Sequence, residues 1–470
     1  MRTRALVVAL AAAVLAGCAL TPPPPHDAVV DQALPKGTRI PPAWQAEAGA
    51  GPVADDWLQS LNDPALDAIV AEAIANNLDL RQAAERVTIA QQSVIVVGSQ
   101  LLPQVGAVFG GRTTRDEDRD KNSNATLAYA GVAWELDVWG RLRAQRAAAE
   151  AGYEATALNY AYARQSLAAT VAKAWTLATE TRQLLGLAEQ AVAIYRTLLE
   201  LVMIRRSAGK DSDLDVVDTR AKLESALSAV EAARESYGEA RRALEVLLGR
   251  YPAAEIEVVA AYPLLPAPPA TGAPAALLER RPDLVAAERE VLAAFRQEEA
   301  AKLALLPDFS LSLVGGRLGD QLLTLLRLNP WLASAAIGVS IPIYEGGALR
   351  AKVEIATAQQ AQAVARYGGV VLTAFREVEN ALANEQLLAK RLPLDQRALR
   401  NRTEAVRIAT VQYVAGSRDL LWVSNLQTGQ LTTEADLIKL RGLQRVNRIR
   451  LLLALGGSFD PAPAMIPPDR

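Results

Sequence analysis

Cys18 is the only cysteine and His26 the only histidine among the 470 residues of the chain. A single thiol permits neither an internal disulfide nor a multi-cysteine metal site. His26 lies in the proline-rich segment TPPPPHDA, so the rest of the chain has no imidazole for acid-base catalysis or metal binding. The sequence also contains no Gly-rich phosphate loop and no carboxylate pair at a strand end. We therefore expect no enzyme, no metal site and no cofactor.

The position of Cys18 gives its thiol a different chemistry. Two arginines precede an apolar run that is shorter than the ~20 residues a membrane helix needs, as in a secretory leader. The segment LAGC resembles a bacterial lipobox, in which cleavage leaves the cysteine as the lipidated first residue. The sequence thus predicts a signal peptide at 1–17 and a covalent lipid on Cys18. Ala19 stands where lipoproteins of the inner membrane carry aspartate, which favours the outer membrane.

Charge and composition describe the rest of the chain. The 50 basic and 52 acidic residues nearly balance, which gives no electrostatic case for binding nucleic acid. The chain is 51% hydrophobic but only 5% aromatic, and alanine and leucine are abundant. This composition favours long, closely packed helices.

The two halves of the sequence resemble each other. Asp79 and Pro103 match Asp283 and Pro307 at an offset of 204 residues, and the turn Ala208-Gly209 matches Ala415-Gly416 at an offset of 207. We expect a lipidated, proline-rich tether at 18–55, a first repeat at 56–250, a linker at 251–280, a second repeat at 281–457 and a C-terminal tail at 458–470.

Each repeat is predicted to contain a helix, two strands and a long helical hairpin. From Arg141 to about Ser207, helical spacing of apolar residues without proline predicts one helix of roughly 100 Å. That length suits coiled-coil packing in a tube or bundle. Pro393 interrupts the equivalent helix of the second repeat, where we expect a kink.

Four segments alternate apolar with small or polar residues, at about 103–113, 126–139, 307–316 and 333–345. Such alternation is typical of transmembrane barrel strands. A soluble sheet with one face on a core is the alternative, but no other element is available to cover the apolar face. Four strands cannot close a membrane barrel, so two or three chains must combine. The candidate lipid-facing residues are Val132, Trp134, Leu136, Phe309, Leu311, Leu313, Ile337, Val339, Ile341 and Ile343.

The order of these features resembles the outer-membrane factor family of the TolC, OprM and NodT kind. The matching segments are the lipobox, ADDWLQSLNDPALDAIVAEAIANNLDL, WELDVWGRLRA and SIPIYEGGALRA. The resemblance implies a mainly helical fold with a transmembrane β part. It implies a homotrimer in which a twelve-stranded barrel in the outer membrane continues as a long helical barrel in the periplasm, with residues 251–280 in its equatorial region. It also implies a periplasmic adaptor and an inner-membrane RND-type pump as partners.

The resemblance further implies functional residues at the hairpin turns. In this family, aspartates after the turn ring the periplasmic end of the pore. Asp215 and Asp218 keep that pattern, whereas Trp422 and Asn425 take the equivalent places in the second repeat. These four residues are the pore-gate candidates, and a solvated helix face is the alternative for the aspartates. The turns Ala208-Gly209 and Ala415-Gly416 are the adaptor-contact candidates, although a glycine helix cap would explain them as well.

The expected function is a passive export duct for drugs and other small solutes. A duct for type I protein secretion would have the same architecture. A structural or adaptor lipoprotein of the periplasm would explain the long helices, but it would leave the four alternating strands unexplained.

Overall fold

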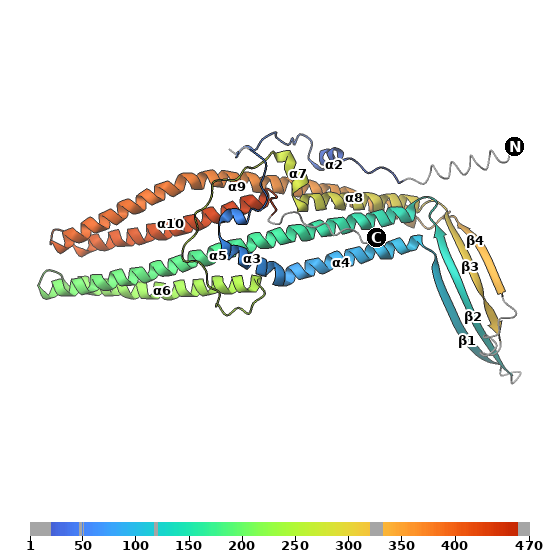
Figure 1. Cartoon of the computed structure of the whole chain (residues 1–470), viewed down its shortest axis with the longest axis horizontal. Helices are drawn as coiled ribbons and strands as arrows, with labels where there is room; N and C mark the ends of the chain where they lie inside the picture. Colours follow the sequence, from blue (N-terminus) through green and yellow to red (C-terminus); the bar gives the residue numbers. More distant parts are fainter. Residues whose placement is uncertain (1–19, 47–48, 50, 117–120, 320–331, 459–470) are drawn as a thin grey trace. The chain divides into compact units, whose positions relative to one another are not determined.

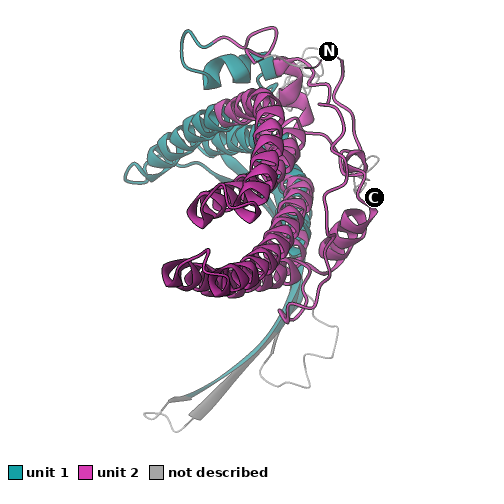
Figure 2. Ribbon diagram, turned by 90° about the vertical axis from the view of Figure 1, so that its left-hand side faces the viewer, with its two compact units in different colours: residues 1–38, 85–158, 285–370 teal, residues 39–84, 159–284, 371–470 magenta. Residues whose placement is uncertain are grey.

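The structure is a computed structural model of the whole chain, and it describes residues 20–46, 49, 51–116, 121–319 and 332–458 (Figure 1). Cys18, the predicted signal peptide and residues 459–470 of the predicted tail lie outside the described residues. The chain divides into two units (Figure 2). Unit 1 contains residues 1–38, 85–158 and 285–370, and unit 2 contains residues 39–84, 159–284 and 371–470.

The order of the elements confirms the two-repeat organisation. Both long first helices of the hairpins have 67 residues, and both second helices have 35. The first repeat comprises α3 (Pro64–Asn76), α4 (Leu78–Gly98), β1 (Gln104–Asp116), β2 (Lys121–Leu136), α5 (Arg141–Ser207) and α6 (Asp213–Leu247). The second comprises α7 (Leu277–Arg280), α8 (Pro282–Leu303), β3 (Asp308–Gly319), β4 (Leu332–Ser340), α9 (Ala348–Val414) and α10 (Leu420–Ala454). A short helix, α2 (His26–Ala33), and three 3₁₀ turns complete the described elements.

The four strands form one antiparallel sheet in the order β1-β2-β3-β4. The two hairpins join through β2 and β3, where Val132 is paired with Leu313. β4 ends at Ser340, so Ile341 and Ile343 lie beyond the strand and their assignment to it is corrected. The reason is Pro342 between them, because proline has no N–H to donate to a strand ladder.

The second long helix is not interrupted at its proline. α9 continues through Pro393 from Ala348 to Val414. Proline removes one backbone hydrogen bond from a helix. Buried residues lie on both sides of that position, among them Leu388 and Ala409.

The core of unit 2 is built around small residues of α5. Ala168, Ala169 and Ala172 are fully buried, and their size lets α5 approach its neighbours closely. Trp175 of α5 donates a hydrogen bond of 3.0 Å from Nε1 to Asp63, whose other oxygen accepts the amide of Leu66 and caps α3. The same cluster includes residues of α3, α6, α10 and the linker after α6.

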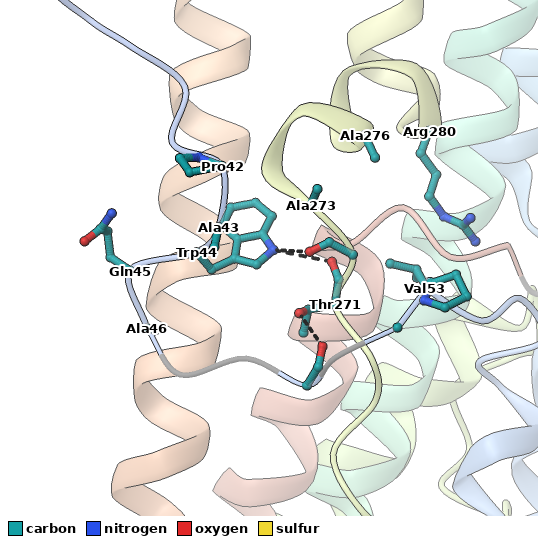
Figure 3. Close-up of a pocket in the computed structure, with 14 residues that line it drawn as sticks. Pro42, Ala43, Trp44, Gln45, Ala46, Val53, Thr271, Ala273, Ala276 and Arg280 are labelled. Carbon is teal, nitrogen blue, oxygen red and sulfur yellow. Dashed lines mark hydrogen bonds between the residues drawn. The ribbon is translucent and has the colours of Figure 1, made fainter.

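Residues before α3 are bound to the linker of unit 2. The indole N–H of Trp44 donates to the carbonyl of Gly272 at 3.0 Å, and the amide of Thr271 donates to the carbonyl of Gly49 at 3.2 Å. A pocket lies between these two segments (Figure 3). The predicted tether is therefore folded onto the linker over this stretch.

The start of α5 in unit 1 is set by one carboxylate. Asp137 accepts the amides of Leu142 and Arg143 at 2.9 and 3.0 Å, so it satisfies donors that the first turn of the helix leaves free. In the same unit, the N-terminal segment contacts α8, where His26 Nδ1 lies 3.0 Å from Glu288. None of the described helices is long and apolar enough to cross a membrane.

Candidate functional site

Two tight turns close the long helical hairpins, and they share one backbone geometry. Gly209 and Gly416 have φ angles of 69° and 79°, which favour glycine. The amide of Gly209 donates to the carbonyl of Arg206, and the amide of Gly416 donates to the carbonyl of Tyr413, both at 2.9 Å. These are Schellman-type helix ends. The four predicted turn residues, Ala208, Gly209, Ala415 and Gly416, are all exposed. Their contact with an adaptor stays a prediction.

Asp215 caps the helix that follows the first turn. The hydroxyl of Ser212 accepts the amide of Asp215 at 3.2 Å, and the Asp215 carboxylate accepts the amide of Ser212 at 2.8 Å. This reciprocal capping box satisfies two donors at the start of α6. The signal for it was present in the sequence as a serine with an aspartate three residues later. Asp215 thus has a structural role besides its predicted role in the pore.

Asp218 takes part in a link between two helices. Its carboxylate accepts a hydrogen bond of 2.7 Å from Lys222, one turn further along α6. The same ammonium group donates to Ser424 of α10 at 2.6 Å, and Ser424 is buried. The charge of Asp218 is therefore partly compensated within the chain, which lowers the field it would add to a pore.

The second-repeat residues Trp422 and Asn425 are exposed on α10. The amide of Trp422 donates to Asp419, the N-cap of that helix, at 3.0 Å. The guanidinium of Arg418 lies 5.1 Å from the centre of the indole ring, which is within cation-π distance. The structure thus places the cation of Arg418 beside Trp422. At the offset of 207 residues, Trp422 corresponds to Asp215, which is a carboxylate.

A buried polar contact joins the tips of the two hairpins, and the sequence reasoning missed it. Arg205 at the end of α5 forms an ion pair with Asp211 at 3.1 Å, and the Tyr413 hydroxyl of α9 donates to the same carboxylate. The guanidinium of Arg205 lies 4.3 Å from the centre of the Tyr413 ring. Asp211 was visible in the turn segment, but the approach of Tyr413, 202 residues away, was not.

Burial and hydrogen bonding shift the pKa values of two side chains in this contact, Tyr413 and Arg205. Tyr413 is fully buried, and burial raises the pKa of its hydroxyl above the usual range, with the charge of Asp211 adding to the rise. The hydrogen bond to Asp211 also raises the pKa of the Arg205 guanidinium. The tyrosine stays neutral and the arginine stays charged, so the three side chains form a permanently polar link.

The register of the sheet brings the predicted lipid-facing residues together. Direct pairing of Leu136 with Phe309, Trp134 with Leu311, and Leu311 with Ile337 places them on one face. The residues of the prediction on this face are Val132, Trp134, Leu136, Phe309, Leu311, Leu313, Ile337 and Val339.

The first strand adds apolar residues to this face that the prediction left out. Val105 pairs with Val132, and Phe109 pairs with Ala128, so both belong to the same face. Each is 78% exposed. The opposite face carries mostly glycine, serine and alanine, among them Ser310 and Gly338. Glycines interrupt the alternation of β1 and hid its apolar residues from the sequence reasoning.

The edges of the sheet are open. β1 pairs only with β2 and β4 pairs only with β3 among the strands that the structure describes. Unpaired edge strands present rows of free N–H and C=O groups that another strand can take up. Over the same residues, no cluster of three or more His, Cys, Asp and Glu could hold a metal ion.

The chain matches the family model described as "Outer membrane efflux protein" over residues 69–250 and 273–457. It belongs to the outer membrane efflux protein family. The two matched segments correspond to the two repeats, and each includes one strand pair and one helical hairpin. The members of this family are channel proteins of the outer membrane, so the protein is an outer-membrane efflux channel.

Individual relatives agree over almost the whole chain. The chain is 29% identical to the toluene efflux pump outer membrane protein TtgF of Pseudomonas putida, over 98% of each protein. It is 28% identical to the pyoverdine export outer membrane protein OpmQ of the same species, over 94% of each. The open-state structure of the Neisseria gonorrhoeae MtrE outer membrane channel is similar with a TM-score of 0.81, at 25% identity over 94% of this chain and 99% of that one.

Proposed function

We propose that the protein is the passive, trimeric exit duct of a tripartite efflux pump and that it moves drugs and other small solutes outward. The observation that carries assembly from several copies is the four-stranded sheet with two open edges and one apolar face, and the number three is taken from the resemblance to the family. Pairing of β4 in one copy with β1 in the next satisfies both edges. Three copies supply twelve strands, which is enough to close a barrel in lipid.

The hairpin tips are the proposed contact sites for the partners. The exposed turns Ala208-Gly209 and Ala415-Gly416 offer the same backbone twice in each chain. A periplasmic adaptor that holds these turns would connect the duct to an inner-membrane RND-type pump. The duct itself uses no energy source and no cofactor in this proposal, so the pump supplies the driving force.

The anchor of the duct is the covalent lipid proposed for Cys18. Its thiol is the only one in the chain. Palmitate labelling of the wild-type protein and of Cys18→Ala tests this assignment, since a labelled Cys18→Ala product would contradict it.

The cargo is expected to be small and varied. The relatives TtgF and OpmQ are named for toluene and pyoverdine, which differ greatly in chemistry, although the two proteins resemble this chain to a similar degree. This favours a duct that selects little by itself. We therefore assign the choice of cargo to the pump.

The test is an accumulation assay in a strain that lacks the gene. The deletion strain is compared with the same strain carrying the gene on a plasmid. Both strains are loaded with a fluorescent dye and, in separate experiments, with a panel of antibiotics, and the retained amount is measured. Increased retention that the plasmid reverses would support the proposal. Normal retention together with a protein trapped in the periplasm would contradict it and favour type I secretion.

A further inference from the structure

A pocket of unit 2 lies between the stretch before α3 and the linker after α6 (Figure 3). We call it the tether–linker pocket. Its lining residues are mostly small or apolar. Those at its rim are exposed, among them Pro42, Ala43, Pro52, Ala273 and Ala276. Contiguous apolar surface of this kind is typical of a binding groove.

The walls of the pocket are held in place by contacts beneath them. The indole of Trp44 packs edge-on against Phe375 of α9, with 6.1 Å between the ring centres, and its N–H donates to the carbonyl of Gly272. One turn further along α9, the carboxylate of Glu379 accepts two backbone amides of the same stretch, including that of Gln45 at 2.8 Å. The pocket is therefore formed before anything binds, which lowers the entropic cost of binding.

Arg280 has a hydrogen-bond donor that the pocket leaves unused. Figure 3 shows its side chain reaching toward the stretch that contains Val53. Its Nη2 donates to Asp55 at 2.5 Å, but its Nε is buried and has no acceptor among the residues that the structure describes. A buried donor without a partner is costly. An occupant that supplies a carbonyl or carboxylate oxygen would remove this cost.

The walls offer few acceptors in return. The carbonyls of Gly49 and Gly51 accept the amides of Thr271 and Gly272, and the carbonyl of Gly272 accepts the indole N–H of Trp44. The N–H groups of an occupant would therefore find little to bind. A proline-rich segment suits such walls, because proline has a carbonyl but no N–H. Extended proline-rich segments also dock in grooves lined by aromatic side chains.

The chain itself brings a segment of this kind to the pocket. The described part ends at Ser458, whose amide donates at 3.0 Å to the same oxygen of Asp55 that accepts Arg280. The carbonyl of Ser458 accepts the amide of Asp56. The last described residue therefore lies beside the pocket wall.

Residues 459–470 follow directly and read FDPAPAMIPPDR. Four of the twelve are proline, and no charged residue lies between Asp460 and Asp469. As a polyproline helix, twelve residues would span roughly 37 Å, so the segment is long enough to enter a pocket that adjoins its first residue. A segment attached so close to its site has a high effective concentration there. This favours it over a separate protein and over the same segment of another copy.

We propose that residues 459–470 dock in the tether–linker pocket of their own chain, as an extended proline-rich segment with a carbonyl that accepts the Nε–H of Arg280. The docked segment would cover the exposed rim and join the tether, the linker and the C-terminal residues in one contact. This inference goes beyond the proposed function and does not depend on it, because every contact that supports it lies within unit 2.

A binding experiment tests the docking. The protein is purified in detergent both in full and without residues 459–470, and a fluorescent peptide of that sequence is titrated into each sample. The shortened protein should bind the peptide, and the full-length protein should bind it about tenfold or more weakly, because its own segment competes. No binding by the shortened protein would overturn the inference. Equal binding by both would show a pocket open to a separate partner and would overturn it too.

Ala276→Trp and Ala275→Trp form a matched pair of variants. Ala276 lines the pocket, whereas its neighbour Ala275 is exposed and does not. In the shortened protein, the large side chain at 276 should weaken peptide binding about tenfold or more, since it fills the site. The same side chain at 275 should leave binding unchanged. Equal effects of the two variants would place the peptide elsewhere.

Two further changes test the chemistry of the contact. A peptide with alanine in place of its four prolines gains N–H groups and loses its preset extended form, so it should bind about tenfold more weakly. Arg280→Lys keeps the positive charge but has no Nε–H, and it should also weaken binding. Undiminished binding in either case would contradict the proposed contact.

Hydrogen exchange locates the segment in the intact protein. Removal of residues 459–470 should speed the exchange of amides in 271–280, and added peptide should slow it again. Full-length Ala276→Trp should show the same faster exchange without any truncation. Unchanged exchange in both proteins would overturn the inference.

A mixed sample separates docking within a chain from docking between copies. Full-length Ala276→Trp chains are co-expressed with shortened chains, and the two forms of the 271–280 fragment are then distinguished by mass. The shortened chains should keep their fast exchange in the mixture. Protection of their pocket would show that the segment comes from a neighbouring copy, and it would overturn the assignment to the same chain.

Discussion

The two aspartates predicted to lie at the pore also stabilise the structure at the hairpin tips, so a mutation at either one can change both folding and transport. Asp215 closes a capping box, and Asp218 is bound by Lys222. An alanine at either position would disturb the helix and remove a charge together. Asparagine is more informative at both positions, because its side-chain oxygen can still accept the same hydrogen bonds.

We predict that Asp215→Asn with Asp218→Asn lowers the preference of the channel for cations while leaving its folding intact. Up to six carboxylates of a trimer would lose their charge. Ion selectivity in planar bilayers measures the effect, with Asp213→Asn, on the exposed start of α6, as the control. Unchanged selectivity would reduce the two aspartates to helix-capping and surface roles.

The buried carboxylate of Glu245 should make stability depend on pH. Burial by itself would raise its pKa, but the amides of Ile256, Ala254 and Glu255, at 2.6 to 2.9 Å, outweigh burial and lower the pKa. A carboxyl whose pKa is lowered by folding stabilises the protein above its unfolded pKa of about 4.3, and this contribution disappears as the pH falls through the folded value.

The corresponding variant is Glu245→Gln. It should lower the free energy of unfolding by about 1–3 kcal/mol at pH 7, and the difference from the wild type should shrink as the pH falls through the lowered pKa of Glu245. Thermal unfolding in detergent over a series of pH values from 7 downward measures the difference. Glu239→Gln, on the exposed side of the same helix, should leave the stability unchanged at every pH. A loss that stays the same over the whole pH series would show that the Glu245 charge is not the cause.

At the scale of elements, two glycines of the first hairpin should respond in opposite directions to the same substitution. Gly209 has a positive φ, so Gly209→Ala should destabilise the protein by about 1 kcal/mol. Gly186 lies inside α5 with open space where an alanine methyl group would point, so Gly186→Ala should stabilise it by about 0.5–1 kcal/mol. The melting temperatures of the two variants test this prediction. A shift of the same sign in both would contradict the proposal that Gly209 is needed for its positive φ.

The apolar face of the sheet yields a prediction about insertion. Val339→Arg places a charge on the proposed lipid face and should cost about 2–4 kcal/mol near the bilayer centre. The fraction of protein recovered as assembled trimers in outer membranes measures this. Ser334→Arg, on the opposite face of the same strand, should assemble normally. Normal assembly of both variants would mean that the face does not meet lipid.

Much of the element pattern could be predicted from the sequence, because it depends on local spacing. Proline-free helical periodicity located α5, and alternation located β3 closely. α9 is continuous through Pro393, and the kink expected there stays a prediction. Contacts between distant residues could not be predicted. The meeting of Arg205, Asp211 and Tyr413 depends on how two hairpins pack, which no local spacing encodes.

At the scale of the whole molecule, the two hairpins have equal lengths and different surfaces. The matched pairs of 67 and 35 residues keep the two halves in step. Their side chains no longer agree, since Lys210 and Asp211 of one turn correspond to Ser417 and Arg418 of the other at the offset of 207. Family membership could be predicted from the order of motifs. The difference in side chains between the two turns is apparent only when equivalent positions of the two repeats are compared.

The shared backbone geometry of the two turns affects how many partner molecules one oligomer can bind. A partner that recognises only the backbone around Gly209 and Gly416 would find two equivalent places on every chain, and so six around a ring of three. A partner that recognises side chains would find two alternating kinds of place and would fill one kind first. The number of adaptor molecules bound at saturation, and whether they bind in one step or two, therefore depends on which part of the turn they recognise.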